Sequence, residues 1–511
     1  MICVSIGRSR HKMIVHEHRA LAEKGAELVE LRLDWLAGLP NLARLINDRP
    51  TPVVITCRRK SEQGRWTSSE DQRITVLRAA IAAGVEYVDL EEDVAQQIQR
   101  YADTKRIVSH HDFEQTPEDL EIIHARLCKL DPDIVKLVTM ANSANDMVRV
   151  LRLVKESDVP TVGFCMGEWG LASRVLCGKF GAPFTYASFS SRRVVAPGQL
   201  SFDAMKDLYR FDSINSETQV YGVLGDPIGH SLSPLIHNTA FRDADLNCVY
   251  LPFRVAKNAL SSTLDEFELF DVRGYSVTIP HKQAVLEKSQ YLDEAVQEIG
   301  AANTLFKDDQ GHWRTSNTDY DAALESIRLG LSSRRFGDAD TEDTTDGLEI
   351  ELKGKKVLMF GAGGVARAIG LGIVRSNAEL TITNRTHQRA IRLAEELGCQ
   401  HIPWADRDLV GADILINCTP VGMHPNVGES PFSADWLNEQ MLVFDTVYNP
   451  EETVLIGQAR EKGCRTVTGL EMFVRQAAMQ FQCFTGKPVP LEQMQKTVRE
   501  YIDGAIEWSS R

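Results

Sequence analysis

The stretch KKVLMFGAGGVARAIG, residues 355–370, decides the fold of the second half of the chain. Val357–Phe360 are four consecutive apolar residues that predict a buried strand, and a helical pattern follows the glycines. Glycines at this point permit a tight turn, so that the backbone can approach a pyrophosphate at the N-terminus of the helix. Strand, glycine-rich turn and helix in this order predict a Rossmann-type dinucleotide-binding domain. The predicted cofactor contacts are Gly361, Ala362, Gly363, Gly364, Val365 and Ala366.

The strand that follows indicates which dinucleotide is bound. Glu379–Thr383 predict this strand, which ends in Asn384, Arg385 and Thr386. No acidic residue stands where an NAD-binding domain holds the ribose hydroxyl, and an arginine there can pair with the 2′-phosphate of NADP. We therefore expect NADP, with Arg389 assisting; the alternative is that Arg385 is a solvated surface residue. Later strands of this sheet are predicted at Ile414–Cys418 and Leu442–Phe444.

The composition is that of a globular protein with several domains. The chain has 511 residues, of which 43% are hydrophobic and 25% charged, and its length suggests about three domains. A formal net charge of −14 argues against nucleic acid or an anionic membrane as a partner. No apolar run approaches the roughly 20 residues of a membrane helix, and the first residues predict a short strand rather than a signal peptide. Ten cysteines without a Cys-x-x-Cys pair favour free thiols in a reducing cytoplasm, with no metal site.

Eight short apolar runs recur along the first two hundred residues. Most gaps between them hold amphipathic helical sequence, such as Asp71–Gly84 and Ala144–Ser157. Eight strands that alternate with helices predict a (β/α)8 barrel, a fold whose chemistry lies at the C-terminal ends of the strands. The predicted strands are Ile2–Ile6, Leu28–Asp34, Pro52–Cys57, Tyr87–Glu91, Arg106–Asp112, Ile134–Met140, Thr161–Gly167 and Pro183–Ser188.

Several of these strands carry polar residues at or near their ends. Glu30 and Arg32 alternate with leucines, so both should face the barrel interior. Lys136 lies within an apolar strand, where a charged amine is costly to bury. Either Lys136 forms a structural ion pair with Glu30, or it is a desolvated amine that forms a Schiff base with a ketone. His111, at the end of the preceding strand, would then be a plausible general base.

Six motifs over residues 1–210 resemble the type I 3-dehydroquinate dehydratases. They are VELRLD, CRRKSEQG, SHHDFEQTPED, DIVKLVTM, GLASR and VAPGQLS, in this order. The resemblance implies that Lys136 forms an imine with the substrate ketone, that His111 moves the protons, and that Glu62 orients His111. It also implies that the substrate's carboxylate and hydroxyls are held by Glu30, Arg32, Arg58, Arg174 and Gln199. Val195 departs from the family, which usually has serine or threonine there.

Residues 220–330 form a different unit, rich in polar groups at the ends of predicted elements. Ser231 and Ser233 precede a helix, Lys282 follows a strand, and Asn303 and Asp319 stand near turns. Each has an ordinary structural interpretation, as a helix cap, a solvated lysine or a turn residue. Together they supply the hydroxyls, amide, ammonium and carboxylate that hydride transfer to a polyhydroxylated acid would need beside a nicotinamide.

The motifs LGDPIGHSLSPLIHN, GYSVTIPHK, GAANTL, TSNTDYDA and GLEMFVRQAAMQFQCFTG resemble shikimate dehydrogenase over residues 218–505. The resemblance implies that Lys282 and Asp319 form a catalytic pair, and that Tyr448 closes the site. It implies substrate contacts from Ser231, Ser233, Thr278, Asn303 and Gln476. Ser276 departs from the asparagine that many members have, and residues 331–350 add a partly acidic loop that we interpret as a flexible connection.

The order of the modules resembles the fused dehydroquinate dehydratase–shikimate dehydrogenases. The expected domains are a barrel at 1–212, a substrate domain at 218–330 completed by about 470–505, and an NADP domain at 351–469. The resemblance implies small-molecule substrates, 3-dehydroquinate, 3-dehydroshikimate and shikimate, and two consecutive steps between them. The oligomeric state is left open. Three alternatives stay open: an aldolase paired with a quinate-type dehydrogenase, a sensor or scaffold with decayed sites, and a chain with one active half.

Overall fold

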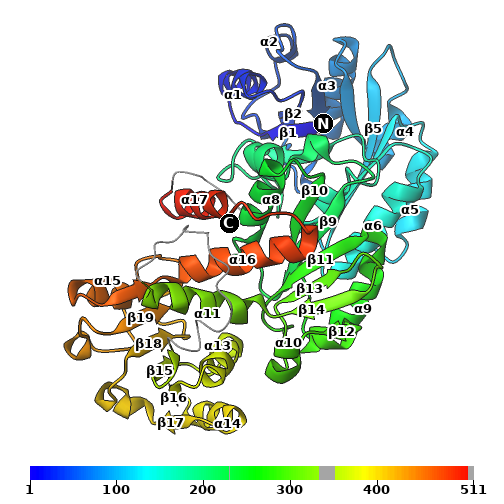
Figure 1. Ribbon diagram of the computed structural model, residues 1–511. Helices are drawn as coiled ribbons and strands as arrows, with labels where there is room; N and C mark the ends of the chain where they lie inside the picture. The colour runs from blue at the N-terminus through cyan, green and yellow to red at the C-terminus, as the bar shows by residue number, and fades with distance from the viewer. Residues whose placement is uncertain (230, 333–351, 505–511) are drawn as a thin grey trace. The chain divides into compact units, whose positions relative to one another are not determined.

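The computed structural model describes residues 1–229, 231–332 and 352–504, and the predicted acidic loop at 331–350 lies almost wholly outside these ranges. The chain forms two compact units (Figure 1). Of the described residues, the first unit comprises Met1–Ser231 and Asn247–Val272, and the second comprises Leu232–Leu246 and those from Arg273 to Gly504. None of the helices in the described ranges is long and apolar enough to cross a membrane.

The first unit contains a parallel sheet of eight strands, as the sequence predicts. Its order is β7-β6-β5-β4-β3-β2-β1-β8, so β8 pairs with β1, and no pairing of β7 with β8 is found in the described part of the sheet. The barrel is therefore nearly closed. The strands are β1 (Ile2–Ile6), β2 (Leu28–Arg32), β3 (Val53–Thr56), β4 (Tyr87–Glu91), β5 (Lys105–Asp112), β6 (Ile134–Met140), β7 (Thr161–Met166) and β8 (Thr185–Ser188).

Local capping explains where the helices around the barrel begin. Ser69 accepts a hydrogen bond from the Gln72 backbone and starts the helix α3, and Ser143 forms a capping box with Asp146 at the start of α6. Both helices were predicted within about two residues. The helices are α1 (His11–Glu23), α2 (Leu42–Ile46), α3 (Glu70–Ala82), α4 (Glu92–Gln97), α5 (Leu120–Cys128), α6 (Ala144–Glu156) and α7 (Ser173–Leu176).

The segment after the barrel is tied down by hydrogen bonds. The Asp212 carboxylate pairs with the N-terminal ammonium at 3.0 Å. Thr218 is buried, its hydroxyl donates to Asn247 Oδ1 at 2.8 Å, and its carbonyl accepts from Lys179 Nζ at 2.6 Å. The polar run at residues 212–219, which follows the barrel, is thus part of the folded first unit.

The first unit also includes the first two strands that follow the barrel. Strands β9 (Gln219–Gly225) and β10 (Cys248–Arg254) pair in parallel, and α9 (Leu260–Glu266) follows them. Arg254 forms an ion pair with Glu168 at 2.7 Å, and Phe270 packs on Phe180 with ring centroids 6.1 Å apart. Glu168 and Phe180 belong to the barrel, so this segment packs against the barrel surface.

The second unit contains a parallel six-stranded sheet in the order β17-β16-β15-β18-β19-β20. The four strands predicted here are present, and the Rossmann-type fold is confirmed. Strands β17 and β20 were missed, because each has three residues, only one of the six is buried, and neither contains an apolar run. The elements are β15 (Lys356–Phe360), α13 (Gly364–Arg375), β16 (Glu379–Thr383), α14 (His387–Leu397), β17 (Gln400–Ile402), β18 (Ile414–Asn417), β19 (Leu442–Asp445), α15 (Val454–Glu461) and β20 (Arg465–Val467).

The remaining elements of the second unit carry the predicted dehydrogenase residues. The long helices α11 and α16 run side by side (Figure 1). On α16, Gln480 accepts from Ser276 Oγ at 2.5 Å and donates to Thr304 Oγ1 at 3.2 Å, which joins α16 to β11 and β13. These elements are α8 (Ser233–Asp243), β11 (Val272–Val277), β12 (Tyr291–Leu292), α10 (Glu294–Ile299), β13 (Thr304–Lys307), β14 (Trp313–Ser316), α11 (Thr318–Leu331), α16 (Gly469–Thr485) and α17 (Leu491–Ile502).

Candidate active sites

The structure brings the predicted barrel residues together in one cavity. They come from β2, β5 and β6, from the segments after β3 and β8, and from α7. This placement agrees with the expectation that polar groups near the strand ends face a common site. The cavity is lined by all the predicted residues and by the departing residue Val195: Glu30, Arg32, Arg58, Glu62, His111, Lys136, Arg174, Val195 and Gln199.

Lys136 lines this cavity from β6. Its Nζ is 2.9 Å from Asp89 Oδ2, 3.8 Å from Glu30 Oε1 and 4.1 Å from the centroid of the Tyr186 ring. Glu30 is already engaged, because its carboxylate accepts hydrogen bonds from Ser5 at 2.6 Å and from Thr56 at 2.8 Å. The nearest acid to the lysine is therefore Asp89, which is not among the site residues predicted from the sequence.

His111 lies on β5, beside the strand that carries Lys136. Burial lowers the pKa of His111 well below its ordinary value, and the positive charges of Arg58 and Lys136 lower this pKa further. The imidazole is therefore neutral near pH 7 and can accept a proton. Glu62 Oε2 is 3.6 Å from His111 Nδ1, which is longer than a hydrogen bond. Glu62 instead accepts from Arg58 Nη1 at 3.0 Å.

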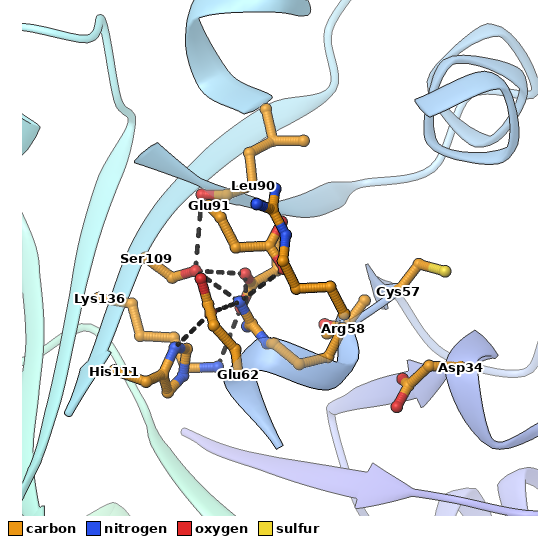
Figure 2. A network of polar contacts seen from close by, with 12 residues as sticks. Asp34, Cys57, Arg58, Glu62, Leu90, Glu91, Ser109, His111 and Lys136 are labelled. Carbon is orange, nitrogen blue, oxygen red and sulfur yellow. Dashed lines mark hydrogen bonds and ion pairs between the residues drawn. The ribbon is translucent and has the colours of Figure 1, made fainter. Parts of the chain in front are cut away.

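Arg58 is the centre of a buried ion cluster. Its guanidinium contacts Glu62 and Glu91 at 3.0 Å and Asp89 at 2.8 Å. Figure 2 shows Arg58 between Glu62 and Glu91, and its Nη1 also donates to Ser109 Oγ on β5 at 3.2 Å. Arg32 is likewise compensated, by a bidentate pair with Asp34 at 2.9 Å.

Arg174 differs from the other two arginines of the cavity. It is 1% exposed, and Nη2 donates to the carbonyl of Pro197 at 2.9 Å. Burial lowers the pKa of Arg174 to about 10. In the described part of the chain no carboxylate forms an ion pair with this guanidinium. A buried cation without a protein anion is suited to bind the carboxylate of a ligand.

In the second unit, Lys282 and Asp319 form a close ion pair. Lys282 Nζ is 2.5 Å from Asp319 Oδ2; Asp319 is buried and Lys282 is half-buried. Asp319 lies in the first turn of α11, whose N-cap is Asn317 rather than Asp319. Asn303 holds this turn in place, because its amide oxygen accepts from the Thr318 backbone at 2.8 Å and its nitrogen donates to Thr318 Oγ1 at 3.0 Å.

The glycine-rich turn lies next to Lys282. Gly361 has φ +111°, and a Cβ there would lie 2.8 Å from the Cys418 carbonyl oxygen, so glycine is required. Gly363 is exposed and caps α13 without a side-chain hydrogen bond, which leaves the first N–H groups of α13 available. A Cβ on Gly364 would lie 3.8 Å from Lys282 Cδ. The catalytic candidate therefore adjoins the turn expected to hold the dinucleotide.

The strand-end arginines stand where the sequence predicts a 2′-phosphate site. Arg385 and Arg389 are both exposed, and in the described ranges neither forms an ion pair. Asn384 closes the turn by donating to the Thr386 carbonyl at 2.9 Å. Free guanidinium groups at this position and an open glycine turn fit the phosphates of NADP.

The other predicted dehydrogenase residues occupy different surroundings. Tyr448 stacks on Phe473 with ring centroids 4.7 Å apart, and Gln476 donates to the Phe473 carbonyl at 3.1 Å. Thr278 follows β11 and is half-buried. Ser233 is the first residue of α8, whose N-cap is Leu232, so the alternative of Ser231 as a helix cap is wrong. Ser231 belongs to the first unit.

These features define a class of protein with two catalytic sites: a barrel that carries a buried lysine beside a neutral histidine, and a dinucleotide-dependent dehydrogenase. Comparison with known families agrees. Residues 2–216 match the type I 3-dehydroquinase model and 223–305 match the shikimate dehydrogenase substrate binding domain. Residues 344–445 match the shikimate/quinate 5-dehydrogenase model, and 469–499 match the shikimate 5′-dehydrogenase C-terminal domain.

Individual relatives give the same result. The chain is 39% identical over 517 residues to the chloroplastic bifunctional 3-dehydroquinate dehydratase/shikimate dehydrogenase of Arabidopsis thaliana, covering 98% of this chain and 84% of that protein. It is 37% identical to the NADP⁺ shikimate dehydrogenase of Methanosarcina mazei, covering 56% of this chain and 99% of that one. A crystal structure of a shikimate dehydrogenase in complex with NADP⁺ aligns with TM-score 0.50 and 35% identity, covering 57% of this chain and 97% of that one. The chain belongs to the family of bifunctional 3-dehydroquinate dehydratase/shikimate dehydrogenases.

Proposed function

We propose that this chain catalyses two consecutive steps of the shikimate pathway, on the route to chorismate and the aromatic amino acids. The barrel dehydrates 3-dehydroquinate to 3-dehydroshikimate, and the second enzyme reduces this ketone to shikimate with NADPH. The observation that carries the proposal is the position of Lys136 in a buried cavity beside a neutral His111, in the same chain as the Lys282–Asp319 pair. We also propose a cytoplasmic location, which the ten free cysteines support.

In the barrel, Lys136 attacks the substrate ketone and forms an imine with it. The protonated imine withdraws electrons, so that His111 can remove a proton from the adjacent carbon. The same imidazole then donates to the departing hydroxyl, which leaves as water. Arg174 holds the substrate carboxylate, because no protein acid pairs with it in the described structure. Glu30, Arg32, Arg58 and Gln199 hold the ring hydroxyls, and Glu62, 3.6 Å from His111 Nδ1, orients His111 electrostatically rather than by a hydrogen bond.

In the dehydrogenase, bound NADPH supplies the hydride. Lys282 donates a proton to the ketone oxygen, and Asp319 orients its ammonium group at 2.5 Å. The substrate hydroxyls and carboxylate are bound by Ser231, Ser233, Thr278, Asn303 and Gln476, and Tyr448 closes the site. The domains that carry these roles are the barrel at 1–212, the substrate domain at 218–330 with about 470–505, and the NADP domain at 351–469.

A coupled assay of the purified chain tests this function. With 3-dehydroquinate and NADPH as the only substrates, we expect stoichiometric oxidation of NADPH and formation of shikimate. Enone formation without NADPH would show the barrel acting alone. Failure of NADPH oxidation with added 3-dehydroshikimate would contradict the second activity. Faster NADP⁺ reduction with quinate than with shikimate would favour the quinate-type alternative.

Replacing Arg385 by alanine should weaken NADPH binding selectively. The loss of charge-assisted hydrogen bonds to a phosphate costs about 1.5–3 kcal/mol, so the KM for NADPH should rise roughly 10- to 150-fold. The KM for NADH should stay the same, since NADH lacks the 2′-phosphate. Steady-state kinetics with both cofactors measure this. Arg392→Ala, another exposed arginine on α14, is the matched control and should change neither constant. An equal effect on NADH would contradict the role of Arg385.

A further inference from the structure

Asp89 is a buried carboxylate in the barrel to which the roles above assign no function. It lies on β4, its side chain is fully enclosed, and it does not line the cavity in which the substrate would bind. Its carboxylate accepts hydrogen bonds from two cationic side chains and one hydroxyl. Asp89 Oδ2 accepts from Lys136 Nζ at 2.9 Å, and Oδ1 accepts from Arg58 Nη2 at 2.8 Å and from Ser109 Oγ at 2.6 Å.

The strand register explains why these groups meet. β4, β5 and β6 are consecutive neighbours in the sheet, and Ser109 is paired with Lys136 across β5 and β6. Side chains alternate along a strand, so Asp89 lies between the apolar residues Val88 and Leu90 but points to the opposite face. The result is a carboxylate fixed on the inner face, two strands away from the lysine that it contacts.

The surroundings keep Asp89 ionised. Burial alone would raise the pKa of Asp89, but the charges of Arg58 and then Lys136 outweigh burial and hold this pKa well below its ordinary value. Other charged groups also face the lysine. Glu30 is 3.8 Å from Nζ, and Arg58 and His111 lie around it. Of the acids in the described barrel, only Asp89 reaches hydrogen-bond distance of the lysine nitrogen.

The chemistry at Nζ gives this contact a function. A lysine ammonium and a ketone combine to give an iminium and one water molecule: two of the three ammonium protons leave with the carbonyl oxygen, and one N–H remains. The nitrogen carries one positive charge before and after this step. A fixed carboxylate can therefore pair with both the resting ammonium and the iminium without moving.

We propose that Asp89 is the permanent counter-ion of the Lys136 nitrogen, holding the ammonium in place and accepting a hydrogen bond from the N–H of the iminium. This inference rests on the proposed Schiff-base function of Lys136. Arg58 and Ser109 in turn fix the orientation of the carboxylate through Oδ1, which leaves Oδ2 for the lysine.

Asp89→Asn tests the proposal, because asparagine keeps the shape and removes the charge. Loss of one preorganised electrostatic partner costs on the order of 10²- to 10³-fold in kcat, so dehydration should slow by about this factor. The KM for 3-dehydroquinate should change much less, because Asp89 does not line the cavity. The rate of borohydride-trapped adduct formation on Lys136, followed by mass spectrometry, should fall in parallel with kcat.

Glu91→Gln is the matched control. Glu91 lies two residues further along β4 and is equally buried, but it binds Arg58 and Arg73 at 3.0 and 2.8 Å rather than Lys136. We expect this variant to form the trapped adduct at nearly the wild-type rate. If Glu91→Gln slows trapping as much as Asp89→Asn does, or if Asp89→Asn traps at the wild-type rate, the counter-ion role is wrong. If the wild-type enzyme itself gives no adduct, the proposed Schiff-base function fails instead.

A second variant keeps the test decisive if Asp89→Asn does not fold. For Asp89→Asn, the rate of 3-dehydroshikimate reduction shows whether the second enzyme is intact, and thermal unfolding shows whether the barrel is folded. Ser109→Ala removes the 2.6 Å hydrogen bond that orients Asp89 Oδ1. We expect a smaller loss of trapping rate, roughly 3- to 10-fold, in line with about 1 kcal/mol for one hydrogen bond. A wild-type trapping rate in Ser109→Ala, with an unfolded Asp89→Asn barrel, would overturn the proposal.

Discussion

Replacing Lys136 by alanine should abolish the dehydration of 3-dehydroquinate. The amine is the group that bonds to the substrate, and loss of such a nucleophile costs on the order of 10⁴-fold or more in kcat. Among the residues that the structure describes, no other lysine lines the barrel cavity to replace it. Enone formation from 3-dehydroquinate measures the loss, and borohydride treatment with substrate should leave the mass of the variant unchanged.

The second activity of the chain is the built-in control for Lys136→Ala. Reduction of 3-dehydroshikimate with NADPH should continue at the wild-type rate, because Lys282 and Asp319 lie in the second unit. Lys105→Ala, an exposed lysine at the start of β5, should leave both activities intact. Loss of both activities in a folded Lys136→Ala variant would contradict the assignment of two separate sites.

Replacing Lys282 by methionine should have the opposite selectivity. Methionine keeps much of the apolar stem but cannot donate a proton to the ketone oxygen. A positioned acid–base group contributes about 10²- to 10⁴-fold, so kcat for 3-dehydroshikimate reduction should fall by roughly 10³-fold. The KM for NADPH should change little. Initial rates of NADPH oxidation at saturating substrate measure this effect.

The variant Asp319→Asn tests whether Lys282 and Asp319 act together as a catalytic pair or whether Lys282 acts alone. Because Asp319 Oδ2 contacts Lys282 Nζ at 2.5 Å, the two side chains should act as one unit. The double variant should then be little worse than Lys282→Met alone, since the effects of coupled residues do not add. Fully multiplicative losses in kcat would contradict a shared role. Dehydration by the barrel should persist in all three variants.

In the barrel and in the six-stranded parallel sheet of the second unit, strands could be predicted from the sequence where both faces are buried, because their residues are then mostly apolar. At least half of the positions in each barrel strand are buried, with polar residues inside β2, β4 and β5, and β15, β18 and β19 are buried at nearly every position. The edge strands β17 and β20 are not, because backbone hydrogen bonds rather than apolar side chains define them. The absence of strand pairing between β7 and β8 in the described sheet also has no signature in the sequence, because pairing depends on three-dimensional closure.

The candidate sites could be predicted where a residue is out of place in its own element. Lys136 stands out in an apolar strand, and the glycines stand out between a strand and a helix. Asp89 could have been suspected, since it also interrupts an apolar strand. Its partner, however, depends on the register of three strands and not on spacing in the chain. The Ser276–Gln480 bond spans 204 residues, and only the fold brings these two side chains together.

The packing of Phe270 on Phe180 has a consequence for synthesis on the ribosome. The barrel sequence is complete near Asp212, but its covering segment ends about 60 residues later, which at 5–20 residues per second corresponds to about 3–12 s of translation. During that interval the newly made barrel has one apolar contact surface without its cover. A slow codon in this region would lengthen the exposure, so pausing there should favour aggregation of the nascent chain.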